Sequence, residues 1–218
     1  MSNPPSATIG TLADLMGGLG RIPLERVRMQ PAPGTATEAD VLARPDGFKR
    51  LLELVDGVLV EKPMGFYESR LAAVLIGFIA DYLERRDLGI VLGADATLRL
   101  APGLVRLPDV AFISWDRFPD RKLPPEPIPD VPPDLAVEVL SRGNTRAEME
   151  RKLREYFAAG ARLVWYLDPE TRVVSVYRSP EDVTEVDEDG VLEGGDILPG
   201  FSLPVREWFA AAGERRPS

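Results

Sequence analysis

Cysteine and histidine are both missing from this chain of 218 residues. Without cysteine the protein can form no disulfide and no thiolate metal site. Without histidine it lacks the commonest general base and metal ligand. Any catalysis must therefore depend on carboxylates, lysine, hydroxyl groups or a metal ion bound by oxygen.

Long apolar runs are missing as well. The longest apolar pattern, residues 71–83, is interrupted by Gly77 and Asp81 and is too short to cross a bilayer. The first ten residues, MSNPPSATIG, show no basic region followed by an apolar stretch, which would mark a signal peptide. With 44% apolar residues, we expect an ordinary globular protein that is cytoplasmic and has no membrane partner.

Positive charge is scarce, since the net charge is −9. Such a balance argues at first sight against a nucleic-acid partner. However, Lys and Arg outnumber Asp and Glu by 8 to 5 over residues 141–178, and are outnumbered by 3 to 10 over residues 179–218. The stretch 141–178 therefore permits a polyanion-binding face, although a solvated helix of mixed charge explains it equally well.

The chain divides into an extension and one domain. We expect residues 1–47 to form an N-terminal extension that lies over the domain or dangles, residues 48–212 to form a single domain, and residues 213–218 to be a disordered tail. Within the extension, 11–16 and 37–43 have short helical patterns. Between residues 118 and 133 the chain has seven prolines and no periodicity, which predicts a loop.

We expect an α/β (α+β) fold, in which helices flank a central mixed sheet and the C-terminal tail is rich in β-structure. A hairpin is expected over 51–61, with Asp56-Gly57 at its turn. Thr145 and Glu148 form a capping box, and Gly160 stops the helix that they begin. The expected helices are 71–83, 145–159 and 204–212, and the further strands are 89–100, 105–114, 135–140, 162–167 and 172–178.

Glu138 lies in the middle of an apolar strand, LAVEVL, and raises the question of what it faces. A buried carboxylate without a partner is costly to desolvate. Asp109 follows Pro108 inside the expected strand 105–114, where we expect it to share a face with Leu107, Ala111 and Ile113. Alone, Asp109 is more readily explained as a residue that caps a turn, whereas for Glu138 function and structure are evenly balanced.

Lys152 borders the apolar side of the expected helix 145–159. It is three residues after Met149 and four before Tyr156, so it points nearer the core than Arg151 or Arg154. By itself Lys152 is best explained as a surface lysine at the edge of the core, and Tyr156 as a core residue.

Two carboxylates on neighbouring strands form a hard-oxygen site that suits Mg²⁺. Such a metal ion polarises a phosphoryl oxygen and activates a bound water, and a nearby lysine stabilises the developing charge. Together, Asp109, Glu138 and Lys152 predict a Mg²⁺-dependent phosphodiesterase site far more specifically than any one of them does. A cation and an ammonium would also make Glu138 tolerable in its strand.

Pro108-Asp109 followed by Glu138 is similar to the signature of the PD-(D/E)XK nucleases. Leu140 stands where the signature has lysine, but in one branch of that superfamily the lysine is displaced onto the following helix. The chain resembles that branch, the Uma-two family of proposed restriction endonucleases, over roughly residues 50–210. The resemblance is carried by ELVDGVLVE, LPDVAFIS, LAVEVLS, KLREYFAAGARLVWYLDP and GDILPGFSLPVREWF.

The resemblance implies a restriction-endonuclease-like core and a function as a Mg²⁺- or Mn²⁺-dependent endonuclease. Its partner would be nucleic acid, most simply DNA, and a homodimer is left open. Asp109, Glu138 and Val139 would then bind the metal, and Lys152 would be the displaced lysine.

Glu53 and Glu68 occupy regions where the family has further polar groups of its active site. Glu53 is explained slightly better as part of an exposed hairpin face, whereas for Glu68 function and structure are evenly balanced. Glu68-Ser69 stands where many members have a histidine followed by serine, which sets this chain apart. A module that keeps the nuclease fold for binding or assembly, without catalysis, is the alternative function.

Overall fold

The computed structural model describes residues 10–43 and 50–213. The expected disordered tail lies, apart from residue 213, outside the described residues, as does the expected boundary between residues 47 and 48. None of the helices in the described ranges is long and apolar enough to cross a membrane.

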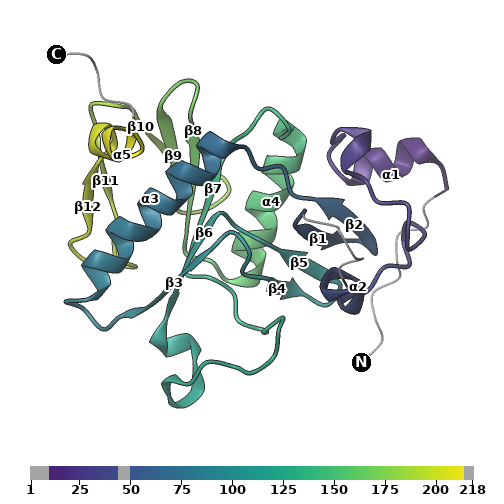
Figure 1. The fold of residues 1–218 in the computed structure, drawn as a ribbon, viewed down its shortest axis with the longest axis horizontal. Helices are drawn as coiled ribbons and strands as arrows, with labels where there is room; N and C mark the ends of the chain where they lie inside the picture. Colours follow the sequence, from purple (N-terminus) through teal and green to yellow (C-terminus); the bar gives the residue numbers. More distant parts are fainter. Residues whose placement is uncertain (1–9, 44–49, 214–218) are drawn as a thin grey trace.

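A mixed sheet of six strands forms the centre of the molecule, in the order β10-β9-β8-β7-β6-β3 (Figure 1). Strands β7 and β8 are parallel, and their connection contains helix α4; the other neighbours are antiparallel. The predicted central mixed sheet is thus confirmed. Its strands are β3 (Gly89–Gly93), β6 (Val110–Ser114), β7 (Leu135–Val139), β8 (Leu163–Asp168), β9 (Val173–Tyr177) and β10 (Val183–Val186).

Helices cover both faces of this sheet (Figure 1). Helices α3 (Phe66–Leu83) and α5 (Val205–Ala211) pack in one apolar core with Leu135, Val137 and Val139 of β7. Helix α4 (Arg146–Ala159) packs in another core with Ala136. Because side chains alternate along a strand, Glu138 points to the α4 face.

A second sheet of four strands, in the order β2-β1-β5-β4, lies beside the first (Figure 1). It contains the predicted hairpin, whose turn is Asp56-Gly57. Gly57 has φ +72°, and a Cβ there would lie 2.6 Å from the carbonyl carbon of Gly34, so only glycine fits. The strands are β1 (Leu52–Val55), β2 (Val58–Glu61), β4 (Leu98–Ala101) and β5 (Leu104–Arg106).

Two expected strands were wrong, because each is split between the two sheets. The range 89–100 forms β3 and β4, and 105–114 forms β5 and β6. The second break falls at Pro108, which has no N–H to donate to a ladder. Leu107 packs in the core of the four-stranded sheet, whereas Ala111 and Ile113 pack beneath α4, so these residues do not share one face as predicted. Asp109 therefore lies where the chain crosses between the sheets.

The described part of the extension packs on the domain. It contains α1 (Leu12–Gly18), the 3₁₀-helix η1 (Leu24–Arg26) and α2 (Glu38–Leu42). Leu15, Leu19 and Ile22 are buried against the hairpin of β1 and β2. Of the two alternatives for this segment, the structure shows the one in which it lies over the domain.

The remaining elements agree with the expected pattern. Helix α4 has the predicted capping box, and Gly160 ends it with φ +104°. Helix α3 begins at Phe66, five residues before the apolar pattern predicted. The proline-rich loop holds only the short 3₁₀-helix η3 (Pro119–Arg121), preceded by η2 (Trp115–Arg117), and the C-terminal part contains β11 (Val191–Glu193) and β12 (Ser202–Pro204) before α5.

Candidate functional site

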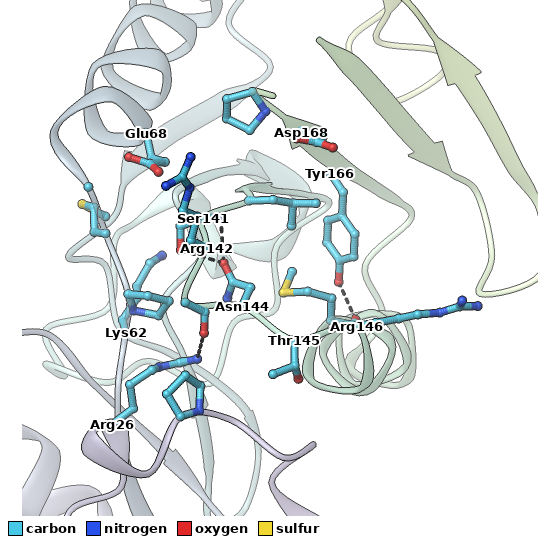
Figure 2. A pocket seen from close by; sticks show the side chains of 18 of the residues that line it. Arg26, Lys62, Glu68, Ser141, Arg142, Asn144, Thr145, Arg146, Tyr166 and Asp168 are labelled. Carbon is cyan, nitrogen blue, oxygen red and sulfur yellow. Dashed lines mark hydrogen bonds between the residues drawn. The ribbon is translucent and has the colours of Figure 1, made fainter. Parts of the chain in front are cut away.

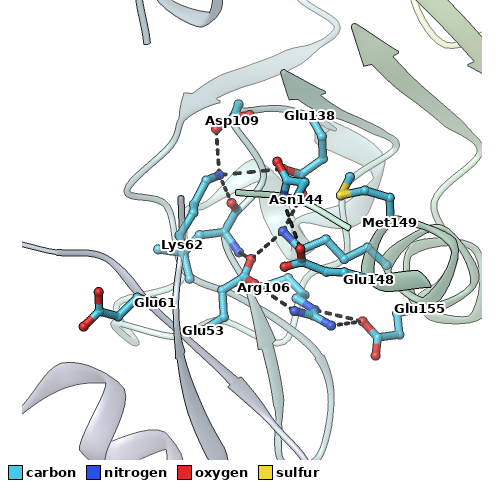
Figure 3. Close-up of polar contacts among 12 residues, drawn as sticks. Glu53, Glu61, Lys62, Arg106, Asp109, Glu138, Asn144, Glu148, Met149 and Glu155 are labelled. Carbon is cyan, nitrogen blue, oxygen red and sulfur yellow. Dashed lines mark hydrogen bonds and ion pairs between the residues drawn. The ribbon is translucent and has the colours of Figure 1, made fainter. Parts of the chain in front are cut away.

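Asp109 and Glu138 lie side by side at the junction of the two sheets. The Asp109 N–H donates to the carbonyl of Val137 on the neighbouring strand β7, at 2.9 Å. Both carboxylates are buried, with 4% of each residue exposed. They approach the same ammonium, since Lys62 Nζ is 2.8 Å from Asp109 Oδ1 and 3.9 Å from Glu138 Oε2 (Figure 3). Glu138 lies on β7, and Asp109 lies in the bend directly before the neighbouring strand β6, so the two acids are adjacent although Asp109 stands outside the strand predicted for it.

The Lys152 ammonium points into this cluster. Its Nζ is 3.2 Å from Glu138 Oε1 and 3.1 Å from Glu53 Oε1, and its side chain is 1% exposed. Arg154 is exposed, and Arg151 pairs with other carboxylates at the helix surface. Lys152, and neither arginine, thus contacts Glu138, one of the two acids at which it was predicted to point, while the ammonium in contact with Asp109 is that of Lys62. The explanation of Lys152 as a surface lysine is wrong.

Glu53 is fully buried, so its explanation as part of an exposed hairpin face is wrong. Strand β1 lies between β2 and β5, and the Glu53 carboxylate turns toward β5 and α4. Arg106 Nη1 donates to its Oε2 at 2.8 Å, and the N–H of Leu107 donates to its Oε1 at 3.3 Å. Glu53 therefore joins Lys152 to Arg106 in one buried ion network.

Tyr156 is a core residue, as expected, but its hydroxyl is also part of the cluster. It is completely buried and donates to Glu138 Oε1 at 2.6 Å. Val139 lies directly beside the cluster through its main chain, because its N–H donates to Asp109 Oδ2 at 2.7 Å, while its side chain packs on the opposite face of the sheet.

Glu68 stands apart from the network. It lies in the first turn of α3 and lines the wall of the groove described below (Figure 2). Within the described residues, no hydrogen bond or ion pair joins it to Asp109, Glu138 or Lys152.

Two cations of the cluster were missed by sequence reasoning. Lys62 directly follows β2, and Arg106 ends β5; they are 6% and 2% exposed. Both stand at strand ends, where a charged side chain is ordinarily solvated, so their positions give no signal of burial. The one available clue was that three carboxylates expected near one another need more positive charge than Lys152 supplies.

A further buried ion pair lies beside the cluster and ties the N-terminal segment to α4. Arg26 forms a bidentate pair with Glu148, at 2.9 and 2.6 Å, and also donates to the carbonyls of Glu61 and Gly143. Gly20 packs on the main chain of Glu148, where a Cβ would lie 2.5 Å from its nitrogen. The capping residue Glu148 thus serves the helix and holds the extension in place.

Burial and charge shift the protonation of the cluster in different directions. Burial raises the pKa of Glu138 above its usual range, against the lowering effect of Lys152 and Lys62. Burial also disfavours charge on Glu53, but Lys152, Arg106 and Lys62 outweigh it and lower its pKa. Burial alone would lower the pKa of Lys152, yet Glu138 and Glu53 raise it. Lys152 therefore stays an ammonium, and of the two glutamates that it contacts, Glu138 takes up a proton more readily than Glu53.

A groove with a volume of about 1490 Å³ opens beside the cluster (Figure 2). Lys62, Met149 and Tyr166 belong to its lining, whereas Asp109, Glu138 and Lys152 lie behind it. Arg142 and Arg146 stand at its edge with side chains 94% and 93% exposed. Cations and carboxylates line it in nearly equal number: Arg26, Arg50, Lys62, Arg142 and Arg146 against Glu25, Glu61, Glu68, Glu150, Asp168 and Glu170.

The oxygens around Lys62 are of the kind that Mg²⁺ prefers. Asp109 Oδ1, Glu138 Oε2 and the carbonyl of Leu107 all approach one cation, the Lys62 ammonium. No group of three Asp or Glu side chains is placed to hold a metal within residues 10–43 and 50–213. Mg²⁺ is commonly bound by one or two carboxylates together with waters and substrate phosphates, so the two acids suffice in kind.

Comparison with known proteins identifies a family and a solved structure with a similar fold. Residues 39–206 match the model of the Uma2 family, described as "Putative restriction endonuclease". A crystal structure from Anabaena variabilis ATCC 29413, of a "putative nuclease belonging to DUF820", is similar with a TM-score of 0.68 and 17% sequence identity. The match covers 79% of this chain and 97% of that one. No curated protein matches the chain.

Proposed function

Because the chain belongs to the Uma2 family of restriction endonuclease-like proteins, we propose that it is a Mg²⁺-dependent endonuclease. It would hydrolyse phosphodiester bonds of nucleic acid, most simply DNA, on a restriction-endonuclease-like core. One observation carries the proposal: Asp109, directly before β6, and Glu138, on the neighbouring strand β7, direct carboxylate oxygens at a single cation, next to a buried lysine.

Asp109 and Glu138 are the proposed metal-binding residues, through Oδ1 and Oε2. Mg²⁺ or Mn²⁺ would supply Lewis acidity toward a phosphoryl oxygen and lower the pKa of a bound water. The other carboxylate oxygens are already engaged: Asp109 Oδ2 by the N–H of Val139, and Glu138 Oε1 by Tyr156 and Lys152. These bonds hold each carboxylate in one orientation, as metal ligands require.

Lys152 is the proposed electrostatic residue. Since its pKa is raised, it stays an ammonium and serves to stabilise negative charge on the phosphoryl group rather than to accept a proton. Glu53 and Arg106 act as positioning residues, because Glu53 bonds both cations and fixes the direction of Lys152.

The groove is the proposed path of the nucleic acid. Arg142 and Arg146 each pair with an exposed carboxylate, at 3.1 and 2.8 Å. Exposed pairs of this kind contribute little, about 0–1 kcal/mol, so both guanidinium groups are available to phosphates. Lys62 connects the groove to the two acids, because it lines the groove and its ammonium pairs with Asp109 and Glu138.

Cleavage of a panel of single- and double-stranded DNA and RNA, with Mg²⁺ or Mn²⁺, tests the proposal. We expect metal-dependent cleavage that falls at least about 100-fold in Asp109→Asn, Glu138→Gln and Lys152→Met, the range expected for removal of a group that stabilises transition-state charge. Asp81→Asn is the matched control, because Asp81 is an exposed acid on α3, and it should keep full activity. Equal activity in Asp109→Asn and Asp81→Asn would refute the proposed site.

A non-catalytic binding or assembly module is the second candidate. It is favoured by the balance of the buried network, in which Glu53, Asp109 and Glu138 face Lys62, Lys152 and Arg106, so that the charges cancel without any metal. This candidate requires that no nucleic acid of the panel is cleaved, and that binding of any partner is the same in Asp109→Asn and the wild type.

A further inference from the structure

The Lys62 ammonium occupies the position between Asp109 and Glu138 where a metal ion would bind. Its side chain is 2% exposed, and its Nζ lies 2.8 Å from Asp109 Oδ1 and 3.9 Å from Glu138 Oε2. The ammonium also donates to the carbonyl of Leu107. Figure 3 shows the long side chain reaching from the end of β2 to the two carboxylates.

A metal ion and this ammonium compete for the same oxygens. A Mg²⁺ ion bound by Asp109 Oδ1 and Glu138 Oε2, at ligand distances of about 2.1 Å, would lie between the two carboxylates in the position that the ammonium now occupies. On the basis of the proposed function, we propose that Lys62 is a displaceable internal cation. Its ammonium occupies the metal position, and the side chain must move into the groove before a divalent ion can bind there.

The structure distinguishes Lys62 from Lys152 in this respect. Lys62 lines the groove, so its side chain has solvent beside it and, along the same wall, the carboxylate of Glu68 (Figure 2). Lys152 does not line the groove and is held by Glu53 as well as Glu138. Departure of Lys62 leaves Lys152 paired, whereas departure of Lys152 would leave Glu53 with Arg106 alone.

Charge gives the displacement a reason. The three carboxylates and three cations of the network balance one another, and Glu155, which also pairs with Arg106, is compensated by Arg151. Adding a divalent ion with Lys62 in place would therefore bury two uncompensated positive charges. Ejecting Lys62 removes one of them, and waters and a substrate phosphate can balance the other. A bound divalent ion and a buried Lys62 are therefore alternatives.

Lysine labelling of the wild-type protein tests the proposal directly. The sequence has only four lysines, at positions 49, 62, 122 and 152, so mass spectrometry can follow each one. With an amine-acylating reagent, Lys62 should react slowly without metal and at least about tenfold faster with saturating Mn²⁺, as its buried population is depleted. Lys122, which is exposed, should react equally in both states, and Lys152 should stay protected. Unchanged labelling of Lys62 at saturating Mn²⁺ would overturn the proposal.

Calorimetric titration with Mn²⁺ is the second test. Lys62→Met removes the competing ammonium and should tighten Mn²⁺ binding about tenfold, if the closed position of Lys62 dominates by that factor in the wild type. Lys122→Met is the matched control and should bind as the wild type does. If Lys62→Met folds only when Mn²⁺ is present, Mn²⁺ takes the place of the missing ammonium, which is the result expected if both cations occupy one position.

The outcomes separate this inference from the proposed function. Mn²⁺ binding that is the same or weaker in Lys62→Met would overturn the inference and leave the nuclease proposal standing. Absence of Mn²⁺ binding to both proteins would overturn both. Tighter binding without cleavage of any nucleic acid would support the displaceable cation and refute the nuclease.

Discussion

Replacing Lys152 by methionine should be among the most damaging single changes to the fold. Methionine keeps much of the side-chain volume but removes the ammonium that lies 3.1 Å from Glu53 and 3.2 Å from Glu138. Removing one partner of a buried ion pair costs roughly 3–5 kcal/mol, because the remaining charge stays buried. We expect Lys152→Met to lose stability in this range, since Glu53 keeps Arg106 but Glu138 keeps only Tyr156 and the more distant Lys62.

A second substitution should recover part of that loss. Burial raises the pKa of Glu138, so keeping this carboxyl charged lowers the stability of the folded wild type. Glu138→Gln alone should therefore change the free energy of unfolding by less than about 1 kcal/mol, with stability level or higher in the absence of metal. Added to Lys152→Met, it should restore at least about 1 kcal/mol, because the uncompensated carboxylate is removed.

The loss should also depend on pH in a definite direction. Burial raises the folded pKa of Glu138 above its usual range, so the folded protein binds this proton more tightly than the unfolded chain does. This carboxyl contributes stability that is present below the unfolded pKa and is lost as the pH rises through the folded pKa. Without Lys152 the folded pKa rises further, so the deficit of Lys152→Met should be largest near about pH 8 and shrink toward about pH 5.

Urea unfolding of the wild type, both single variants and the double variant measures these differences. Arg154→Met is the matched control, because Arg154 is exposed on the same helix and its replacement should stay within about 0.5 kcal/mol. The reasoning would be refuted if Lys152→Met cost no more than Arg154→Met. It would also be refuted if Glu138→Gln made Lys152→Met still less stable.

Three further predictions concern the metal, the N-terminal segment and a glycine contact. Mg²⁺ at 100 times its Kd should stabilise the wild type by about 3 kcal/mol in thermal scans and leave Asp109→Asn unchanged; equal shifts would contradict the assigned site. Arg26→Met should cost about 3–5 kcal/mol in urea unfolding and increase hydrogen exchange around Glu148, whereas a loss below about 1 kcal/mol would show that the pair is dispensable. Gly20→Ala should destabilise the protein, because the added Cβ would clash with the main chain of Glu148. Gly17→Ala should stabilise it by about 0.5–1 kcal/mol, because Gly17 lies in α1 with open space around it. Thermal melting measures both changes, and a shift in the same direction for the two variants would contradict this expectation.

Local chemistry in the sequence was enough to place several features of the site. A carboxylate in the apolar strand LAVEVL had to have a partner, and the helical spacing of Lys152 from Met149 and Tyr156 placed that partner on the next helix. The capping box at Thr145 and the stop at Gly160 bounded this helix. Because β7, α4 and β8 are consecutive, short connections place α4 against the two strands, and the alternation of side chains along β7 determines which of them face α4.

Only the tertiary structure decided the rest of the network. Periodicity could not show that the chain changes sheets at Pro108, since apolar residues suited to a strand stand on both sides of it. That change brings Arg106 to Glu53 and places Asp109 beside Glu138. Lys62 lies 45 residues before Leu107, whose carbonyl it contacts, and nothing local to it signals burial. A cation at a strand end is ordinarily solvated. Its burial here arises because two sheets and α4 meet around it, and that meeting depends on contacts far apart in the chain.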